Sequence, residues 1–214
     1  FTDRRQRQMC IRDSVKPHLP FNAPKKYWDL YDHSKIQLPG NPNQPTNAPP
    51  KAKHAFGELR KFDGIPKNPL PVSDSMARKL IHGYYACVSY IDAQIGILLE
   101  GLDNLNLSEN TIVFILGDHG WSLGEHGLWA KHSPFDLATR TPLIVRTPEH
   151  LSETYKSGRA HGLVEFIDIF PTIMELVDLA ELDQLDGKSF VEQLKDPLSD
   201  GKEVVFPRLS LIHI

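Results

Sequence analysis

Residues 111–131 read TIVFILGDHGWSLGEHGLWAK, and both a sheet strand and a candidate site are predicted from them. The stretch opens with a short apolar run, Ile112 to Leu116, that is rich in β-branched residues and is followed at once by glycine. A run of this length and composition predicts a strand that is buried on both faces, as strands of parallel sheets are. In open α/β sheets, ligand sites form outside the carboxyl ends of the strands, so residues 117–120 occupy the place where a site is expected.

An aspartate and a histidine, Asp118 and His119, lie side by side at this strand end. Both residue types ligate metals and carry protons. The plainer alternative is that Asp118 caps a turn and His119 is a surface histidine, because short motifs often match by chance. Glu125, His126 and Lys131 follow within the same glycine-rich loop. Such a density of polar residues on a loop anchored by a buried strand favours a site.

The loop resembles that of the sulfatases in the alkaline phosphatase superfamily, in particular the iduronate-2-sulfatase type, whose loop has the form GDHGWxLGEHxxWxK. Every position of this pattern matches between Gly117 and Lys131. Further segments typical of the family are KPHLPF at 16–21, ATRTPLI at 138–144 and the D-x-x-P-T pattern at 168–172. The resemblance implies an α/β fold: a partial alkaline-phosphatase-like sandwich with a mostly parallel sheet and flanking helices.

The resemblance also implies hydrolysis of a sulfate ester and gives roles to four residues. Asp118 and His119 match two ligands of one divalent cation, usually Ca²⁺. Lys131 matches a lysine that touches the sulfate group, and His18 in KPHLPF matches a histidine that contacts it. Calcium prefers oxygen ligands, so calcium beside a histidine is expected here only because of the resemblance.

The nucleophile of the family is a cysteine in a C-x-P-S-R segment, oxidised to formylglycine, and no such segment occurs in the 214 residues. The nucleophile and the other metal-binding aspartates are therefore expected on an upstream part of a longer parent protein. Cys87 lies within a helical pattern and lacks this setting, so we interpret it as a core residue. The 214 residues alone are expected to be inactive.

The two ends of the chain are predicted to be an adapter-like artefact, residues 1–14 and 209–214. The DNA ATGTGTATAAGAGACAG encodes MCIRDS, the residues 9–14, and its reverse complement CTGTCTCTTATACACAT encodes LSLIHI, the residues 209–214. Two unrelated peptides at opposite ends are not expected to be antisense to each other, and the DNA resembles a sequencing adapter. These ends are left out of fold reasoning and are expected to be poorly packed.

Without residues 1–14, Lys and Arg fall from 24 to 20 and Asp and Glu from 27 to 25, so the net charge moves from −3 to −5. The basic run at the start is then no nucleic-acid arm, and we expect no nucleic-acid partner. No apolar run approaches the ~18 residues of a membrane helix, so no membrane span is expected. The resemblance makes a periplasmic, secreted or lysosomal location the expectation for the parent enzyme.

The remaining elements are predicted from periodicity and from turn residues. We expect a long helix over Ser75–Leu102, capped by Ser73 or Ser75, and a second buried strand over Pro142–Val145. An amphipathic helix is expected over Leu163–Leu179, in which Pro171 either kinks the helix or begins its second half.

The predicted domains follow from these elements and from the resemblance. Residues 15–187 are expected to form the C-terminal part of the catalytic domain. Residues 188–208 are expected to start a smaller subdomain, with a strand over Glu203–Phe206.

The expected substrate is a sulfated carbohydrate, with Trp121 and Trp129 carrying the iduronate-2-sulfatase resemblance of the loop. Two alternatives stay open from the sequence. One is a metal-dependent phosphodiesterase or phosphatase of the same superfamily, and the other is a non-catalytic carbohydrate-binding relative.

Overall fold

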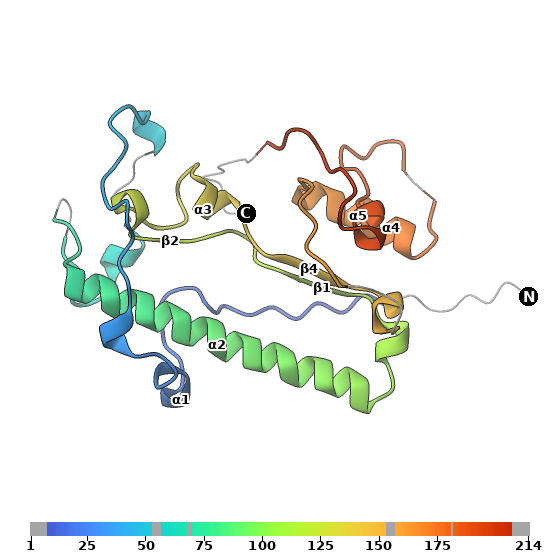
Figure 1. The fold of residues 1–214 in the computed structure, drawn as a ribbon, viewed down its shortest axis with the longest axis horizontal. Coiled ribbons are helices and arrows are strands. Elements are labelled where there is room, and N and C mark those ends of the chain that lie inside the picture. Colours follow the sequence, from blue (N-terminus) through green and yellow to red (C-terminus); the bar gives the residue numbers. More distant parts are fainter. Residues whose placement is uncertain (1–7, 53–56, 68–69, 153–156, 181, 207–214) are drawn as a thin grey trace, which may run out of the picture. The chain divides into compact units, whose positions relative to one another are not determined.

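The computed structural model describes residues 8–52, 57–67, 70–152, 157–180 and 182–206 (Figure 1). The chain divides into two compact units, the first made of Phe1–Leu102 with Ser122–Ala130 and the second of Asp103–Trp121 with Lys131–Ile214. Residues 8–14 of the predicted adapter-like segment are all exposed, and residues 1–7 and 209–214 lie outside the described residues, so the adapter-like nature of both ends stays a prediction. The predicted boundary at residues 187 and 188 stays a prediction.

The long helix α2 spans Asp74–Asn104, which confirms the prediction of Ser75–Leu102 to within two residues (Figure 1). The Ser73 hydroxyl accepts a hydrogen bond from the Met76 N–H at 3.3 Å, so Ser73 caps the helix. Beyond the last turn, Asn106 adopts a left-handed conformation with φ of 54°, which asparagine tolerates better than most residues. Capping chemistry thus sets both ends of α2.

Apolar residues recur at spacings of four and three along α2, which predicts one buried stripe made of Tyr84, Val88, Ile91, Ile95, Leu98 and Leu102. The buried face differs from this stripe, because the Val88 and Leu98 side chains are 41% and 51% exposed. The buried helix residues lie in the N-terminal half instead, namely Ala77, Ile81, His82, Gly83, Ala86 and Cys87. Aromatic residues of the segment before α2 cover this half, through the ring pairs Phe21–Tyr84, Tyr27–Tyr90 and Trp28–His82. Contacts with a distant segment, which periodicity does not reveal, decided which helix residues are buried.

Short elements complete the first unit. The helix α1 spans Lys25–Trp28, and 3₁₀ turns lie at His33–Lys35, Pro50–Ala52 and Leu59–Lys61. The strands β2 (Ser122–Leu123) and β3 (Trp129–Ala130) pair antiparallel, with a 3₁₀ turn at Glu125–Gly127 between them. Leu128 and Trp129 are almost fully buried and anchor this hairpin.

The sheet of the second unit consists of β1 (Val113–Leu116) and β4 (Leu143–Arg146). Their positions confirm both predicted strands, but the predicted parallel direction is wrong for this pair, which is antiparallel with Leu116 opposite Leu143. Parallel neighbours need a crossover that is usually helical. The longest described helix between β1 and β4 is the four-residue α3 (Asp136–Thr139). The strands are also half-buried rather than enclosed on both faces, since Ile144 is 58% exposed.

The remaining helices of the second unit are α4 (Ile169–Leu176) and α5 (Val191–Lys195), with 3₁₀ turns at Ser108–Asn110, Pro148–Leu151 and Phe166–Asp168. The predicted helix over Leu163–Leu179 is too long. Pro171 lies in the first turn of α4, where backbone N–H groups have no partner within the helix, so the proline removes no hydrogen bond. The helix therefore begins just before Pro171 rather than kinking at it.

The predicted strand over Glu203–Phe206 is not formed, and the isolated bridge between Leu163 and Lys202 lies just before this segment. Among the described residues, no helix is long and apolar enough to cross a membrane.

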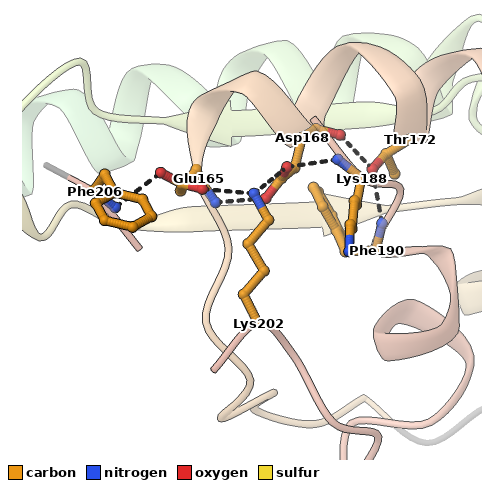
Figure 2. Close-up of polar contacts among 7 residues, drawn as sticks. All are labelled: Glu165, Asp168, Thr172, Lys188, Phe190, Lys202 and Phe206. Carbon is orange, nitrogen blue, oxygen red and sulfur yellow. Dashed lines mark hydrogen bonds and ion pairs between the residues drawn. The ribbon is translucent and has the colours of Figure 1, made fainter. Parts of the chain in front are cut away.

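A polar clasp formed by Glu165, Asp168, Thr172 and Lys202 fastens residues 188–206 to the start of α4 (Figure 2). The Lys202 ammonium lies 2.7 Å from Asp168 Oδ1 and 2.6 Å from Glu165 Oε2. Asp168 also accepts the Lys188 N–H, and the buried Thr172 hydroxyl accepts the Phe190 N–H. The D-x-x-P-T pattern therefore serves a structural purpose in this fold.

Candidate functional site

The loop after β1 is held by backbone hydrogen bonds to residues 138–142. Gly117 N–H donates to the Pro142 carbonyl at 3.2 Å, and the Thr141 hydroxyl donates to the Gly117 carbonyl at 2.8 Å. Gly120 N–H donates to the Ala138 carbonyl at 2.9 Å. A Cβ atom on Gly120 would collide with the carbonyl oxygens of Leu137 and Arg140, so only glycine allows this approach. The loop is thus fixed on both sides of Asp118 and His119.

Asp118 and His119 point toward each other, with 3.5 Å between Asp118 Oδ2 and His119 Nε2. The Asp118 side chain is 88% exposed, whereas His119 is 24% exposed. His119 Nδ1 lies 2.9 Å from the Gly120 carbonyl oxygen, which can only accept a hydrogen bond. Nδ1 therefore donates to this carbonyl, and Nε2 is the ring nitrogen that faces the Asp118 carboxylate.

Trp121 lies between His119 and Lys131. The ring centroids of His119 and Trp121 are 5.8 Å apart with an interplanar angle of 31°. The Lys131 ammonium lies 5.8 Å from the Trp121 ring centroid, within the range of a cation–π contact. Trp121 thus contacts both His119 and Lys131, and His119 in turn faces Asp118.

His18 belongs to the first unit, so its predicted convergence with Asp118 stays a prediction. Its Nε2 lies 2.9 Å from Glu58 Oε1, and its Nδ1 lies 3.0 Å from the Leu19 carbonyl oxygen. Both partners are acceptors, so a ring protonated on both nitrogens satisfies them together. Lys16 donates to the carbonyls of His18 and Pro20 and so holds the backbone around this histidine.

The donor set at the strand end fits part of the coordination of one divalent cation. Asp118 offers a carboxylate and His119 a nitrogen whose ring is oriented by a backbone carbonyl, a common arrangement for a metal-binding histidine. Within the described ranges, no three His, Cys, Asp or Glu side chains gather into a metal-binding group. Asp118 and His119 would supply two ligands, fewer than the six to eight that calcium takes.

Two residues that support the site have no recognisable signal in the sequence. Thr141 lies inside the ATRTPLI segment, but nothing in that segment indicates that its hydroxyl holds Gly117. Glu58 lies in a stretch without periodicity, and its contact with His18 has no local signal. Cys87 was predicted correctly as a core residue, because it is fully buried and burial raises the pKa of its thiol.

Comparisons with curated proteins point to one family. The chain is 36% identical over 192 residues to iduronate 2-sulfatase of Mus musculus and 37% identical over 192 residues to that of Homo sapiens. Each match covers 77% of this chain and 34% of the relative, so the chain spans about a third of the length of these relatives.

Solved structures agree with this assignment. Phosphonate monoester hydrolase from Silicibacter pomeroyi matches with a TM-score of 0.66 and 28% identity, over 84% of this chain and 35% of that one. BT4656, solved in complex with D-glucosamine-2-N,6-O-disulfate, matches with a TM-score of 0.54 and 25% identity, over 69% of this chain and 28% of that one. These likenesses confirm the predicted α/β, alkaline-phosphatase-like fold class. Because the family model described as Sulfatase also matches residues 3–179, which include the whole strand-end loop, the chain belongs to the sulfatase family.

Proposed function

We propose that the parent protein is a sulfuric ester hydrolase that removes sulfate from a sulfated carbohydrate. The observation that carries this proposal is the pairing of Asp118 with His119 at 3.5 Å, with the ring proton fixed on Nδ1 by a backbone carbonyl. A carboxylate and an imine nitrogen on the same side of a strand-end loop are suited to share one cation.

One divalent cation, which we propose to be Ca²⁺, would be held by Asp118 and His119 together with ligands from outside the described residues. When bound, such an ion polarises a sulfate oxygen as a Lewis acid. Negative charge grows on the sulfate oxygens as the ester bond breaks, and fixed cations are the groups that stabilise it. Lys131, positioned by the Trp121 ring, is proposed to supply one such charge, and His18 a second. The formylglycine nucleophile is proposed to lie in the parent protein outside these 214 residues.

The proposed substrate class comes from the relatives. Two mammalian proteins 36% and 37% identical to this chain are named iduronate 2-sulfatase, and the structural neighbour BT4656 binds a sulfated glucosamine as its substrate. A uronate or another sugar of a sulfated polysaccharide is therefore the proposed substrate. A periplasmic, secreted or lysosomal location is proposed with it for the parent protein.

A second candidate function is hydrolysis of phosphonate or phosphate esters. It is favoured by the match to phosphonate monoester hydrolase, with a TM-score of 0.66 over 84% of this chain. The described part of the site suits either ester, because a cation and a lysine stabilise phosphoryl as well as sulfuryl oxygens.

The test is an assay of the full-length parent enzyme on sulfated glycans, aryl phosphates and phosphonate monoesters. The proposal expects the highest kcat/KM on sulfated glycans, and a preference for phosphates or phosphonates refutes it. Asp118→Asn is expected to weaken metal binding at least about tenfold. Lys131→Ala is expected to lower kcat by about 10²–10³, as loss of a charge-stabilising donor does.

Two exposed residues of the second unit provide matched controls for these substitutions. Asp136→Asn and Lys195→Ala change the same residue types at positions that are 79% and 62% exposed, and both are expected to leave kcat and metal affinity unchanged. Near wild-type metal affinity in Asp118→Asn, together with near wild-type kcat in Lys131→Ala, overturns the assignment of the site.

A further inference from the structure

A cavity of about 190 Å³ lies within the first unit, between the segment before α2, the side of α2 and the β2–β3 turn. The buried Ile81 and Tyr85, which is 40% exposed, are among the residues that line it. Pockets for drug-sized ligands begin at about 300 Å³. This cavity therefore has room for a single small ring rather than for an extended chain.

The walls of the cavity are fixed by contacts to the β2–β3 turn. Gly124 has φ of +111°, and the position of a Cβ on it would lie 3.4 Å from the Pro39 ring and 3.3 Å from Trp129. The His126 N–H donates to the Asn41 carbonyl at 2.7 Å, which ties the turn to the segment that carries Pro39. The cavity is thus preformed.

The polar groups of the cavity are a carboxylate and an amide, from Glu125 and Gln37. Glu125 Oε2 accepts the Leu123 N–H at 2.7 Å, which fixes the direction of the side chain. Among the described residues, no protein donor contacts Oε1. A carboxylate oxygen only accepts hydrogen bonds, so the ligand must bring a hydroxyl or amide N–H to it. A sulfate or a uronate would bring a second negative charge and would be disfavoured.

We propose that this cavity binds one uncharged sugar ring of the substrate, with a ring face against Tyr85 and hydroxyl groups on Glu125 and Gln37. The proposal rests on the proposed function, because it takes the substrate to be a carbohydrate. Glu125 belongs to the candidate-site loop, six residues after His119 and six before Lys131. The cavity therefore selects an uncharged hexose or N-acetylhexosamine as one unit of the glycan. The sulfate and carboxylate groups of the glycan bind outside this cavity.

The test is ligand titration of the 214-residue chain, followed by NMR, with N-acetylglucosamine and glucuronate as probes. N-acetylglucosamine is expected to shift the Tyr85 and Glu125 signals with a millimolar Kd, and glucuronate to bind at least about tenfold more weakly. Glu125→Gln keeps the shape and an acceptor for Leu123 but removes the charge, so the ratio between the two sugars is expected to fall below about threefold. Glu100→Gln, an exposed change on α2, is the matched control and is expected to keep the full ratio.

Three outcomes overturn the proposal: no binding of N-acetylglucosamine, equal binding of glucuronate to the wild-type chain, or an unchanged ratio in Glu125→Gln with a native circular dichroism spectrum. The NMR titration measures binding without catalysis, so the cavity proposal and the sulfatase proposal can fail independently. If the full-length enzyme prefers phosphonates while N-acetylglucosamine binds here, the sulfatase proposal fails and the cavity remains a sugar site. If the enzyme desulfates glycans while neither probe binds, the cavity proposal alone fails.

Discussion

Replacing Asp168 by asparagine tests whether the polar clasp holds residues 188–206 against α4. Asp168 is 1% exposed, and its carboxylate accepts three hydrogen bonds. The donors are the Lys202 ammonium at 2.7 Å, the Lys188 N–H at 2.8 Å and the Glu165 N–H at 2.8 Å (Figure 2). Asparagine fills nearly the same volume, so the change removes charge and one acceptor without making a cavity.

The expected cost follows from those three contacts. In Asp168→Asn the amide nitrogen must replace one oxygen, and an opposing buried donor such as the Glu165 N–H is then unsatisfied, at about 1–3 kcal/mol. The remaining contacts lose the charge assistance that makes such bonds about twice as strong. Lys202 keeps its contact with Glu165, so no charge is left without a partner and the cost stays below the upper range for a broken buried pair. We expect a loss of about 2–3 kcal/mol.

Amide hydrogen exchange measures this loss where it occurs. The N–H groups of Lys188, Phe190 and Phe206 all donate to acceptors of the clasp. Their exchange is expected to accelerate about 30- to 150-fold in Asp168→Asn, if they open as one unit. Asp178→Asn is the matched control, because Asp178 is exposed at the end of α4 with φ of 52°, a conformation that asparagine accepts. Exchange within threefold of wild type at all three amides refutes the reasoning.

Two further predictions concern pH and the site loop. The hydrogen bond from Lys202 holds the pKa of Glu165 below its ordinary 4.5, so its stabilisation is present above that value and is lost as the pH falls through the lowered pKa. Burial alone would lower the pKa of Lys202, but the hydrogen bonds and charges of Asp168 and Glu165 outweigh burial and raise this pKa above 10.5. The stability that Lys202 contributes is therefore lost only as the pH rises through the raised pKa. The urea midpoint of unfolding should therefore be constant between the lowered pKa of Glu165 and the raised pKa of Lys202. If the midpoint falls as steeply with acid in Lys202→Met as in wild type, the Glu165–Lys202 contact is not the cause of the acid dependence. Gly120→Ala should cost about 3 kcal/mol and lower the Tm by about 6–12 °C, because the backbone carbonyls it meets cannot move apart cheaply. Gly96→Ala, inside α2 with nothing within 4 Å among the described residues, should instead raise the Tm slightly, and equal effects of the two changes would disprove the packing argument.

Local signals in the sequence were sufficient to place the main elements. Ser73 and Asn106 fix the helix ends by hydrogen bonding and backbone conformation, which depend on a few neighbouring residues. The strands β1 and β4 were found in the same way, from short apolar runs. The antiparallel direction of these two strands was not predicted. Direction depends on the path of the connection between the strands, and nothing in the composition of residues 117–142 excludes a crossover.

The candidate site shows the same limit. Asp118, His119 and Lys131 lie within one sequence motif at 117–131, so the motif indicated all three together. The Thr141 hydroxyl reaches the Gly117 carbonyl across 24 residues, and Glu58 meets His18 from another segment. Such contacts are products of the tertiary fold, and side-chain chemistry alone does not indicate which partners meet.

Gly120 links the backbone to the chemistry of the site in three ways at once. Its N–H is fixed by the Ala138 carbonyl, its own carbonyl fixes the proton of His119 on Nδ1, and its missing Cβ lets the end of α3 approach. The orientation of the proposed metal-binding histidine is therefore set by the main chain and not by another side chain. Because both ends of this connection are backbone groups, side-chain substitutions in α3 that preserve its conformation leave His119 in place. A change that shifts the main chain at Ala138 is transmitted to the ring even though it touches neither Asp118 nor Lys131.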